Sequence, residues 1–207
     1  MNKSRVTDLD EQIEIMLSHF ETVINLNEDE KEYLISFLKF KRVRKRQHIL
    51  QAGDVCHYET FIIKGLLKSY FVDENDTEHI VMFGIESSWI EDGLSLSTGL
   101  PSTINIDALE DSEIFQIDKA SLEELYKRIP AFERFFRIKF QRAFIAEQQR
   151  VICNFTKSAQ DRYLAFLERF PSLGQRISLG QIASFLGITR QFLSHVRSLA
   201  FRSNRII

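Results

Sequence analysis

Four polar residues in one short segment have the types and the spacing that a DNA-reading helix needs. They would share one side of a helix, and they are Arg190, Gln191, Ser194 and His195. Each can hydrogen-bond to base edges or phosphates; an arginine suits guanine and a glutamine suits adenine. Thr189 stands directly before them, where its hydroxyl can cap the helix.

The surrounding residues predict a helix-turn-helix over Leu179–Ala200. Gly187 lies where a tight turn needs a residue without a Cβ atom, and Ile188 would fill the corner. An ordinary pair of antiparallel helices is the alternative, but the combined spacing of the small and apolar residues favours the DNA-binding motif. The positions expected to be buried are Ile182, Ala183 and Leu186 in the first helix and Leu193, Val196 and Leu199 in the second.

The charge distribution supports this interpretation. From Val151 onward the chain has eight basic and two acidic residues, although the whole chain carries a net charge of −2. A basic block that coincides with the motif is the electrostatic pattern of a phosphate-binding surface. Arg197 and Arg202 belong to this block and join the candidate DNA contacts, and Arg205 could touch the DNA backbone. A solvated basic face would not explain the coincidence.

Composition limits the other classes of function. The 207 residues, 44% of them hydrophobic, suit one large or two small domains. No run is long and apolar enough to span a membrane, and no signal peptide is recognisable, so a cytoplasmic location is expected. Cys56 and Cys153 are too few and too far apart to predict a disulfide, a metal site or an iron–sulfur cluster, and no cofactor is expected.

The first part of the chain predicts two helices followed by a β-roll. Leu9–Thr22 has a helical apolar stripe, and Asn27 with Glu30 forms a capping box for the next helix. The basic cluster Lys39–Arg46 could bind nucleic acid, but a solvated strand face is favoured. Short β-like runs at near ten-residue spacing indicate an antiparallel roll. These runs are Lys41–Val43, His48–Leu50, Glu59–Lys64, Leu66–Val72, His79–Phe83, Thr103–Ala108 and Ser112–Asp118.

A long helix is expected after the roll. Lys119–Arg128 predicts a short helix, Pro130 suits the first turn of the long one, and the apolar pattern continues to about Phe155. A second apolar side suggests contacts both with the β-roll and with a dimer mate, because a helix-turn-helix usually reads two half-sites. Complete burial within one chain is the alternative. The candidate interface residues are Phe132, Phe136, Phe140, Phe144 and Val151.

This order of elements resembles the Crp/Fnr (cyclic-AMP receptor protein-like) family of bacterial transcription regulators. The landmarks are the turn Gln51–Asp54 and the segments Phe61–Phe71, Leu109–Tyr126 and Ile188–Leu199. The resemblance implies an α+β protein with an N-terminal jelly-roll domain over residues 1–129, a dimerisation helix over 130–156 and a helix-turn-helix domain over 157–207. That last domain would be winged-helix-like, with a reduced or absent wing.

The resemblance also exposes a departure in the ligand pocket. Members that bind cyclic nucleotides hold the ribose with a Gly-Glu pair and the phosphate with an Arg followed by Ser or Thr. The corresponding positions here are Glu91 and Asp92, then Ser102 and Thr103. An anionic phosphate would therefore meet carboxylates and no cation, which disfavours its binding.

The sequence thus predicts a homodimeric, DNA-binding transcription regulator that does not respond to cyclic AMP. A regulator that senses a cyclic nucleotide or another small ligand through a non-standard pocket is the alternative. A cupin-like enzyme is disfavoured because His48, His57 and His79 are scattered, with no HxH pair. Double-stranded DNA is the expected partner, and RNA polymerase and an unidentified effector are further candidates. No membrane association and no enzymatic activity are expected.

Overall fold

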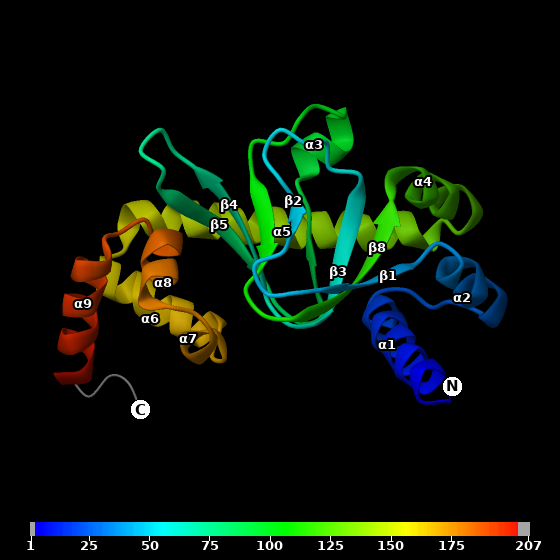
Figure 1. Cartoon of the computed structure of the whole chain (residues 1–207), viewed down its shortest axis with the longest axis horizontal. Coiled ribbons are helices and arrows are strands. Elements are labelled where there is room, and N and C mark those ends of the chain that lie inside the picture. Colours follow the sequence, from blue (N-terminus) through cyan, green and yellow to red (C-terminus); the bar gives the residue numbers. More distant parts are fainter. Residues whose placement is uncertain (1–2, 203–207) are drawn as a thin grey trace. The chain divides into compact units, whose positions relative to one another are not determined.

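The computed structural model describes residues 3–202, with side-chain environments from Leu9 to Ser198. The chain divides into two compact units, which are considered separately. Unit 1 contains the described residues up to Phe71 together with Phe83–Phe140, and unit 2 contains Val72–Met82 and the described residues from Gln141 onward. Figure 1 shows the elements in chain order.

Two antiparallel four-stranded sheets form the β-roll, in the orders β1-β8-β3-β6 and β2-β7-β4-β5. All seven strand runs expected from the sequence are present, with ends shifted by at most two residues. The short strand β6 was not predicted. The strands are β1 Lys39–Val43, β2 His48–Leu50, β3 Tyr58–Lys64, β4 Leu67–Val72, β5 Glu78–Gly84, β6 Ser88–Ile90, β7 Asn105–Ala108 and β8 Ser112–Asp118.

Five helices begin in unit 1, and each begins where its sequence supplies a cap or an amphipathic stripe. The expected capping box of α2 is present, since the Asn27 side chain accepts from the Glu30 backbone N–H and the Glu30 side chain accepts in return. Asp92 and Asp118 cap α3 and α4. The short helix α3 was not predicted. The helices are α1 Lys3–Glu21, α2 Glu28–Ile35, α3 Gly93–Thr98, α4 Lys119–Arg128 and α5 Ala131–Thr156.

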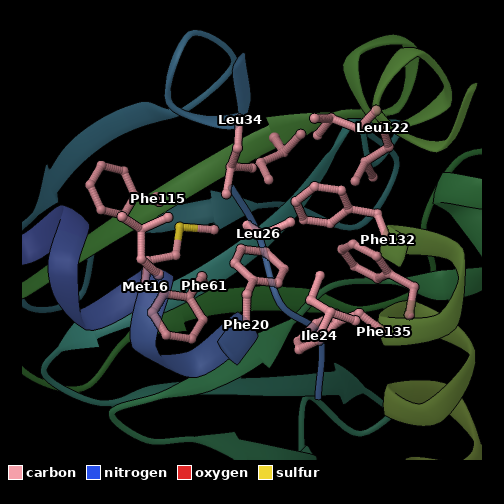
Figure 2. Close-up of a cluster of buried hydrophobic side chains, with 14 of the residues drawn as sticks. Met16, Phe20, Ile24, Leu26, Leu34, Phe61, Phe115, Leu122, Phe132 and Phe135 are labelled. Atoms are coloured by element: carbon pink, nitrogen blue, oxygen red, sulfur yellow. The ribbon is translucent and has the colours of Figure 1, made fainter. Parts of the chain in front are cut away.

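Among the described residues of unit 1, the hydrophobic core cluster combines aliphatic side chains with seven buried aromatic ones. Phe20 of α1 lies between Phe132 and Phe135 of α5, with ring centroids 5.1 and 4.5 Å apart, and Figure 2 shows these rings together. Trp89 of β6 packs edge-on against Phe136 at 5.4 Å. The first turns of α5 are therefore fixed to the β-roll by interlocking rings, which prefer such tilted and edge-to-face arrangements.

The first half of the basic cluster Lys39–Arg46 lies on strand β1, whereas Arg44, Lys45 and Arg46 follow the strand and are exposed. Lys39 pairs with Asp118 at 2.8 Å and Arg42 pairs with Glu113 at 3.0 Å, both across the β1–β8 ladder. These cations neutralise carboxylates of the neighbouring strand. Lys39 and Arg42 therefore stabilise the pairing of β1 with β8.

Unit 2 is mainly helical and includes the end of the β4–β5 hairpin. Its remaining helices are α6 Ala159–Arg169, α7 Leu173–Arg176, α8 Leu179–Leu186 and α9 Arg190–Arg202. The single-turn helix α7 was not predicted. Tyr163 and Phe166 of α6 and Leu173 of α7 are buried together with the inner residues of α8 and α9. A small apolar core thus supports the predicted DNA-binding motif.

Candidate nucleic-acid interface and effector pocket

The turn between α8 and α9 has the geometry that the sequence predicted. Gly187 ends α8 with φ of +65°, a conformation that residues with a Cβ atom rarely adopt. The Ile188 N–H donates to the Ala183 carbonyl at 3.0 Å, and the Gly187 N–H donates to the Ser184 carbonyl at 3.1 Å. This pair of bonds is the Schellman motif, which ends a helix and turns the chain sharply.

The second helix presents a polar face to solvent. The Thr189 hydroxyl accepts a hydrogen bond from the Phe192 N–H at 3.2 Å and so caps the start of α9. Leu193 and Val196 are buried beneath the helix, as predicted. The exposed residues on the other side are Thr189, Arg190, Gln191, Ser194 and His195.

Two further predicted DNA contacts, Arg197 and Arg202, do not belong to this exposed group. Arg197 is half-buried and its charge acts on buried Tyr163, so it lies toward α6 as well as toward solvent. The side chain of Arg202, at the end of α9, lies outside the described residues, as do Leu199, Arg205 and the segment where a reduced wing was expected.

Ser184 of α8 makes a contact that sequence reasoning missed. Its hydroxyl donates to the Glu78 carbonyl at 2.7 Å and accepts from the Ile80 N–H at 2.9 Å. Both partners belong to β5, at the end of the hairpin that forms part of unit 2. The first helix of the motif is therefore attached to a sheet edge by two hydrogen bonds, and no local signal around Ser184 points to residues more than a hundred positions away.

The four candidate pocket residues do not converge on one site. The Asp92 carboxylate accepts from the Ser102 hydroxyl at 2.7 Å and from the Leu94 and Ser95 N–H groups at 3.1 and 3.2 Å. Asp92 is thus engaged in holding the start of α3 and the strand that follows it. Thr103 is exposed, and Glu91 faces a different partner.

That partner is Lys139 of α5, a cation that the sequence analysis did not place near the pocket. Its ammonium group donates to Glu91 at 3.1 Å and makes a short hydrogen bond to Glu59. Lys139 also lies 5.1 Å from the Trp89 ring centroid and 4.6 Å from that of Phe140. A cation therefore lies beside Glu91, and two carboxylates already neutralise it.

Burial makes this ion cluster unusual. Glu59 is 2% exposed, and the side chains of Lys139 and Glu91 are 14% and 12% exposed. Loss of solvation raises the pKa of Glu59 to about 7, and the nearby Glu91 charge adds to that rise while Lys139 opposes it. Two buried carboxylates and one ammonium therefore hold an additional proton until the pH approaches neutrality.

A cavity of about 320 Å³ opens beside this cluster within unit 1. Thr60 and Gln116 are buried neighbours in the β3–β8 register, and the Gln116 amide donates to the Thr60 hydroxyl at 3.1 Å. Glu91 follows β6 and lines the same cavity, whereas Asp92, Ser102 and Thr103 do not. The lining residues are Ile49, Leu50, Asp54, Val55, Cys56, His57, Tyr58, Thr60, Ile90, Glu91, Ile106 and Gln116.

The candidate dimer residues separate into two groups. Phe132 and Phe136 are 0% and 3% exposed, so this part of the interface prediction is wrong: both rings belong to the core of their own chain. Phe140, Phe144 and Val151 are 46%, 64% and 48% exposed. The aromatic stripe of α5 therefore changes from core to surface near Phe140.

The described residues contain neither a metal-binding cluster nor a membrane-spanning helix. Within residues 3–202, no group of three or more His, Cys, Asp or Glu side chains is placed to hold a metal ion. No helix in the same part of the chain is both long and apolar enough to cross a membrane.

Comparison with known families and proteins agrees with this architecture. Residues 40–129 match the cyclic nucleotide-binding domain. The Fumarate and nitrate reduction regulatory protein of Vibrio cholerae is 26% identical over 183 residues, which cover 83% of this chain and 72% of that protein. The protein of the same name from Yersinia pestis is 25% identical over 86% of this chain and 76% of its own length.

Solved structures show the same fold at lower sequence identity. FixK2 from Bradyrhizobium japonicum superposes with a TM-score of 0.70 at 17% identity, over 80% of this chain and 85% of that chain. A Crp/Fnr-family regulator from Eubacterium rectale superposes with a TM-score of 0.67 at 17% identity, over 86% of this chain and 85% of that chain.

Taken with the helix-turn-helix, these likenesses define a DNA-binding transcription regulator whose β-roll is a cyclic nucleotide-binding domain. The relatives are named as regulatory proteins, not enzymes. Over most of its length the chain is similar to regulatory proteins, and it shares the fold of Crp/Fnr-family transcription regulators.

The buried cluster gives a pH prediction. Because the folded pKa of Glu59 is raised from 4.5 to about 7, its contribution to stability is present below pH 4.5 and is lost as the pH rises through 7. The glutamine in Glu59→Gln cannot ionise. Between pH 4.5 and 7, the unfolding free energy of this variant should therefore rise relative to that of the wild type, by up to about 3 kcal/mol.

Urea denaturation between pH 4.5 and 8 measures this difference. Glu123→Gln makes the same change at an exposed position on α4 and should follow the wild type. Parallel curves for wild type and Glu59→Gln would show that Glu59 is ionised throughout.

Proposed function

We propose that this regulator acts as a homodimer and reads double-stranded DNA with the exposed face of α9. The observation that carries the proposal is the capped, solvent-facing group Arg190, Gln191, Ser194 and His195 on a helix anchored by buried Leu193 and Val196. A helix of this kind fits the major groove, where arginine and glutamine can distinguish base pairs.

We assign one function to each of three consecutive segments of the chain. Residues 1–129 form the sensory β-roll, 130–156 the dimerisation helix and 157–207 the DNA-binding domain. The site of action is the cytoplasm, where bacterial DNA is accessible, and RNA polymerase is a candidate partner on the strength of the regulatory role alone.

The second half of α5 supports dimerisation. Phe144, Val151 and Phe155 are 64%, 48% and 85% exposed, an extent that single-chain proteins usually avoid on one helix face. With Gln148 they recur at intervals of four, three and four residues, the spacing of a two-helix coiled coil. Ile145 and Ile152 flank this seam and are also exposed. A second copy of the same helix presents the complementary seam.

Cyclic AMP is not the proposed effector. Ser102 stands where a phosphate-binding arginine would be needed, and its hydroxyl already donates to Asp92. The nearby Lys139 is held between Glu59 and Glu91, so it has little capacity to attract a phosphate. A cavity of about 320 Å³ nevertheless supports a small-ligand-sensing role for the β-roll.

The DNA-reading role can be tested on an operator selected from genomic fragments by the purified protein. Arg190→Ala should weaken specific binding by about 1–3 kcal/mol and relax the preference at one base pair. Arg202→Ala, if it touches only phosphate, should weaken all sequences about equally and reduce the salt slope by roughly one. Arg134→Ala removes the same charge from exposed α5 in unit 1 and should have little effect. Unchanged specific affinity of Arg190→Ala would contradict the assigned register.

Dimerisation can be tested by analytical ultracentrifugation at micromolar concentration. Phe144→Asp should raise the dimer dissociation constant by at least about 100-fold, because each dimer would bury two unpaired carboxylates. Leu100→Asp changes an exposed apolar residue of unit 1 outside α5 and should leave the dimer intact. A monomeric wild-type protein would refute this part of the proposal.

Cyclic AMP should bind no more tightly than about millimolar and should leave the melting temperature unchanged. Isothermal titration calorimetry and a thermal-shift assay measure both. A micromolar dissociation constant would instead support the cyclic-nucleotide-sensing alternative.

A further inference from the structure

Two residues that line the unit 1 cavity each carry a buried acceptor atom with no hydrogen-bond partner among the described residues. One is Oε2 of Glu91, and the other is Oε1 of Gln116, a residue only 3% exposed. Buried polar atoms are nearly always hydrogen-bonded, so two orphan acceptors on residues that line one cavity indicate a site for a molecule that donates hydrogen bonds.

The charge of the lining points in the same direction. Glu91 and Asp54 are its acidic members, and neither a lysine nor an arginine occurs among the described lining residues. Asp54 and His57 are exposed and mark the mouth, whereas Thr60 and Gln116 are buried and mark the inner end. Lys139 offsets part of the Glu91 charge from outside the lining, so the cavity keeps a modest preference for a cation over an anion.

The remaining walls are hydrocarbon. Ile49, Leu50, Ile90 and Ile106 surround the polar inner end, so a bound molecule needs an apolar body as well as a donor group. The volume lies near the lower limit for small-molecule pockets. A compact amine or amidine with a hydrocarbon portion satisfies all of these conditions.

We propose that the β-roll cavity binds a small organic cation, whose ammonium or amidinium group donates to Glu91 and Gln116 while its apolar portion contacts the isoleucine walls. The second oxygen of Glu91 accepts from Lys139 of α5. The ligand and the long helix therefore share one carboxylate. Occupancy of the cavity is sensed by the helix through the charge at Glu91.

Three probes of nearly equal size test the charge preference on the full chain. Benzylamine carries an ammonium group, benzyl alcohol is neutral and benzoate is an anion. Saturation-transfer NMR and thermal shift should show binding of benzylamine, weaker binding of benzyl alcohol and none of benzoate. Equal binding of benzoate and benzylamine, or no binding of benzylamine, overturns the proposal.

Two variants locate the site. Glu91→Gln and Gln116→Leu should each weaken benzylamine binding by about ten-fold or more, because the first removes the negative charge that faces the ammonium group and the second removes an acceptor of its hydrogen bonds. Glu123→Gln, an exposed change on α4, should bind benzylamine as the wild type does. Wild-type affinity in both cavity variants overturns the assignment.

Circular dichroism melts establish that each variant is folded, and operator binding is measured separately. A protein that binds its operator but not benzylamine refutes the ligand proposal alone. A protein that binds benzylamine through Glu91 but no DNA refutes the proposed DNA-reading role and leaves the ligand proposal standing.

Discussion

The packing of the first turns of α5 into the aromatic core is the constraint on which the rest of the structure depends. Phe132, Phe135 and Phe136 are almost completely buried against rings from α1 and β6. Because these three positions fix the rotation of this part of the helix about its own axis, they also decide where the remaining unit 1 side chains of α5 point. Lys139 is thereby directed to Glu59 and Glu91, and the exposed apolar seam begins only after Phe140.

The buried ion cluster is costly in stability, and its position gives that cost a function. Two carboxylates and one ammonium lose most of their hydration, and their mutual attraction replaces it only partly. Apolar residues at all three positions would fill similar space without that loss. The charged cluster instead connects strand β3, the segment after β6 and helix α5, and its charge changes when a proton or a cation arrives. It can therefore couple the state of the cavity to the helix, which an apolar contact could not do.

Local patterns predicted the elements well because their causes are local. Alternating apolar residues, the capping box at Asn27 and the left-handed turn at Gly187 depend on neighbours within a few positions. The three-residue strand β6 and the short helix α3 were missed because so few residues show no periodicity. The aromatic stripe of α5 predicted an apolar face but not its division at Phe140, since burial there depends on rings contributed by α1 and β6.

The candidate pocket also depends on contacts between distant parts of the sequence, which local patterns do not reveal. The family resemblance placed Glu91 in the ligand pocket, and Glu91 does line the cavity. It also suggested Asp92 and Ser102, which are neighbours in the fold but bond to each other. Lys139, Thr60 and Gln116 were missed because they come from α5, β3 and β8, and only the completed roll brings them beside Glu91. A pocket inherited as a shape can therefore change its ligand chemistry through residues that no motif contains. Here Glu91 and Gln116 line the cavity of a β-roll that matches the cyclic nucleotide-binding domain.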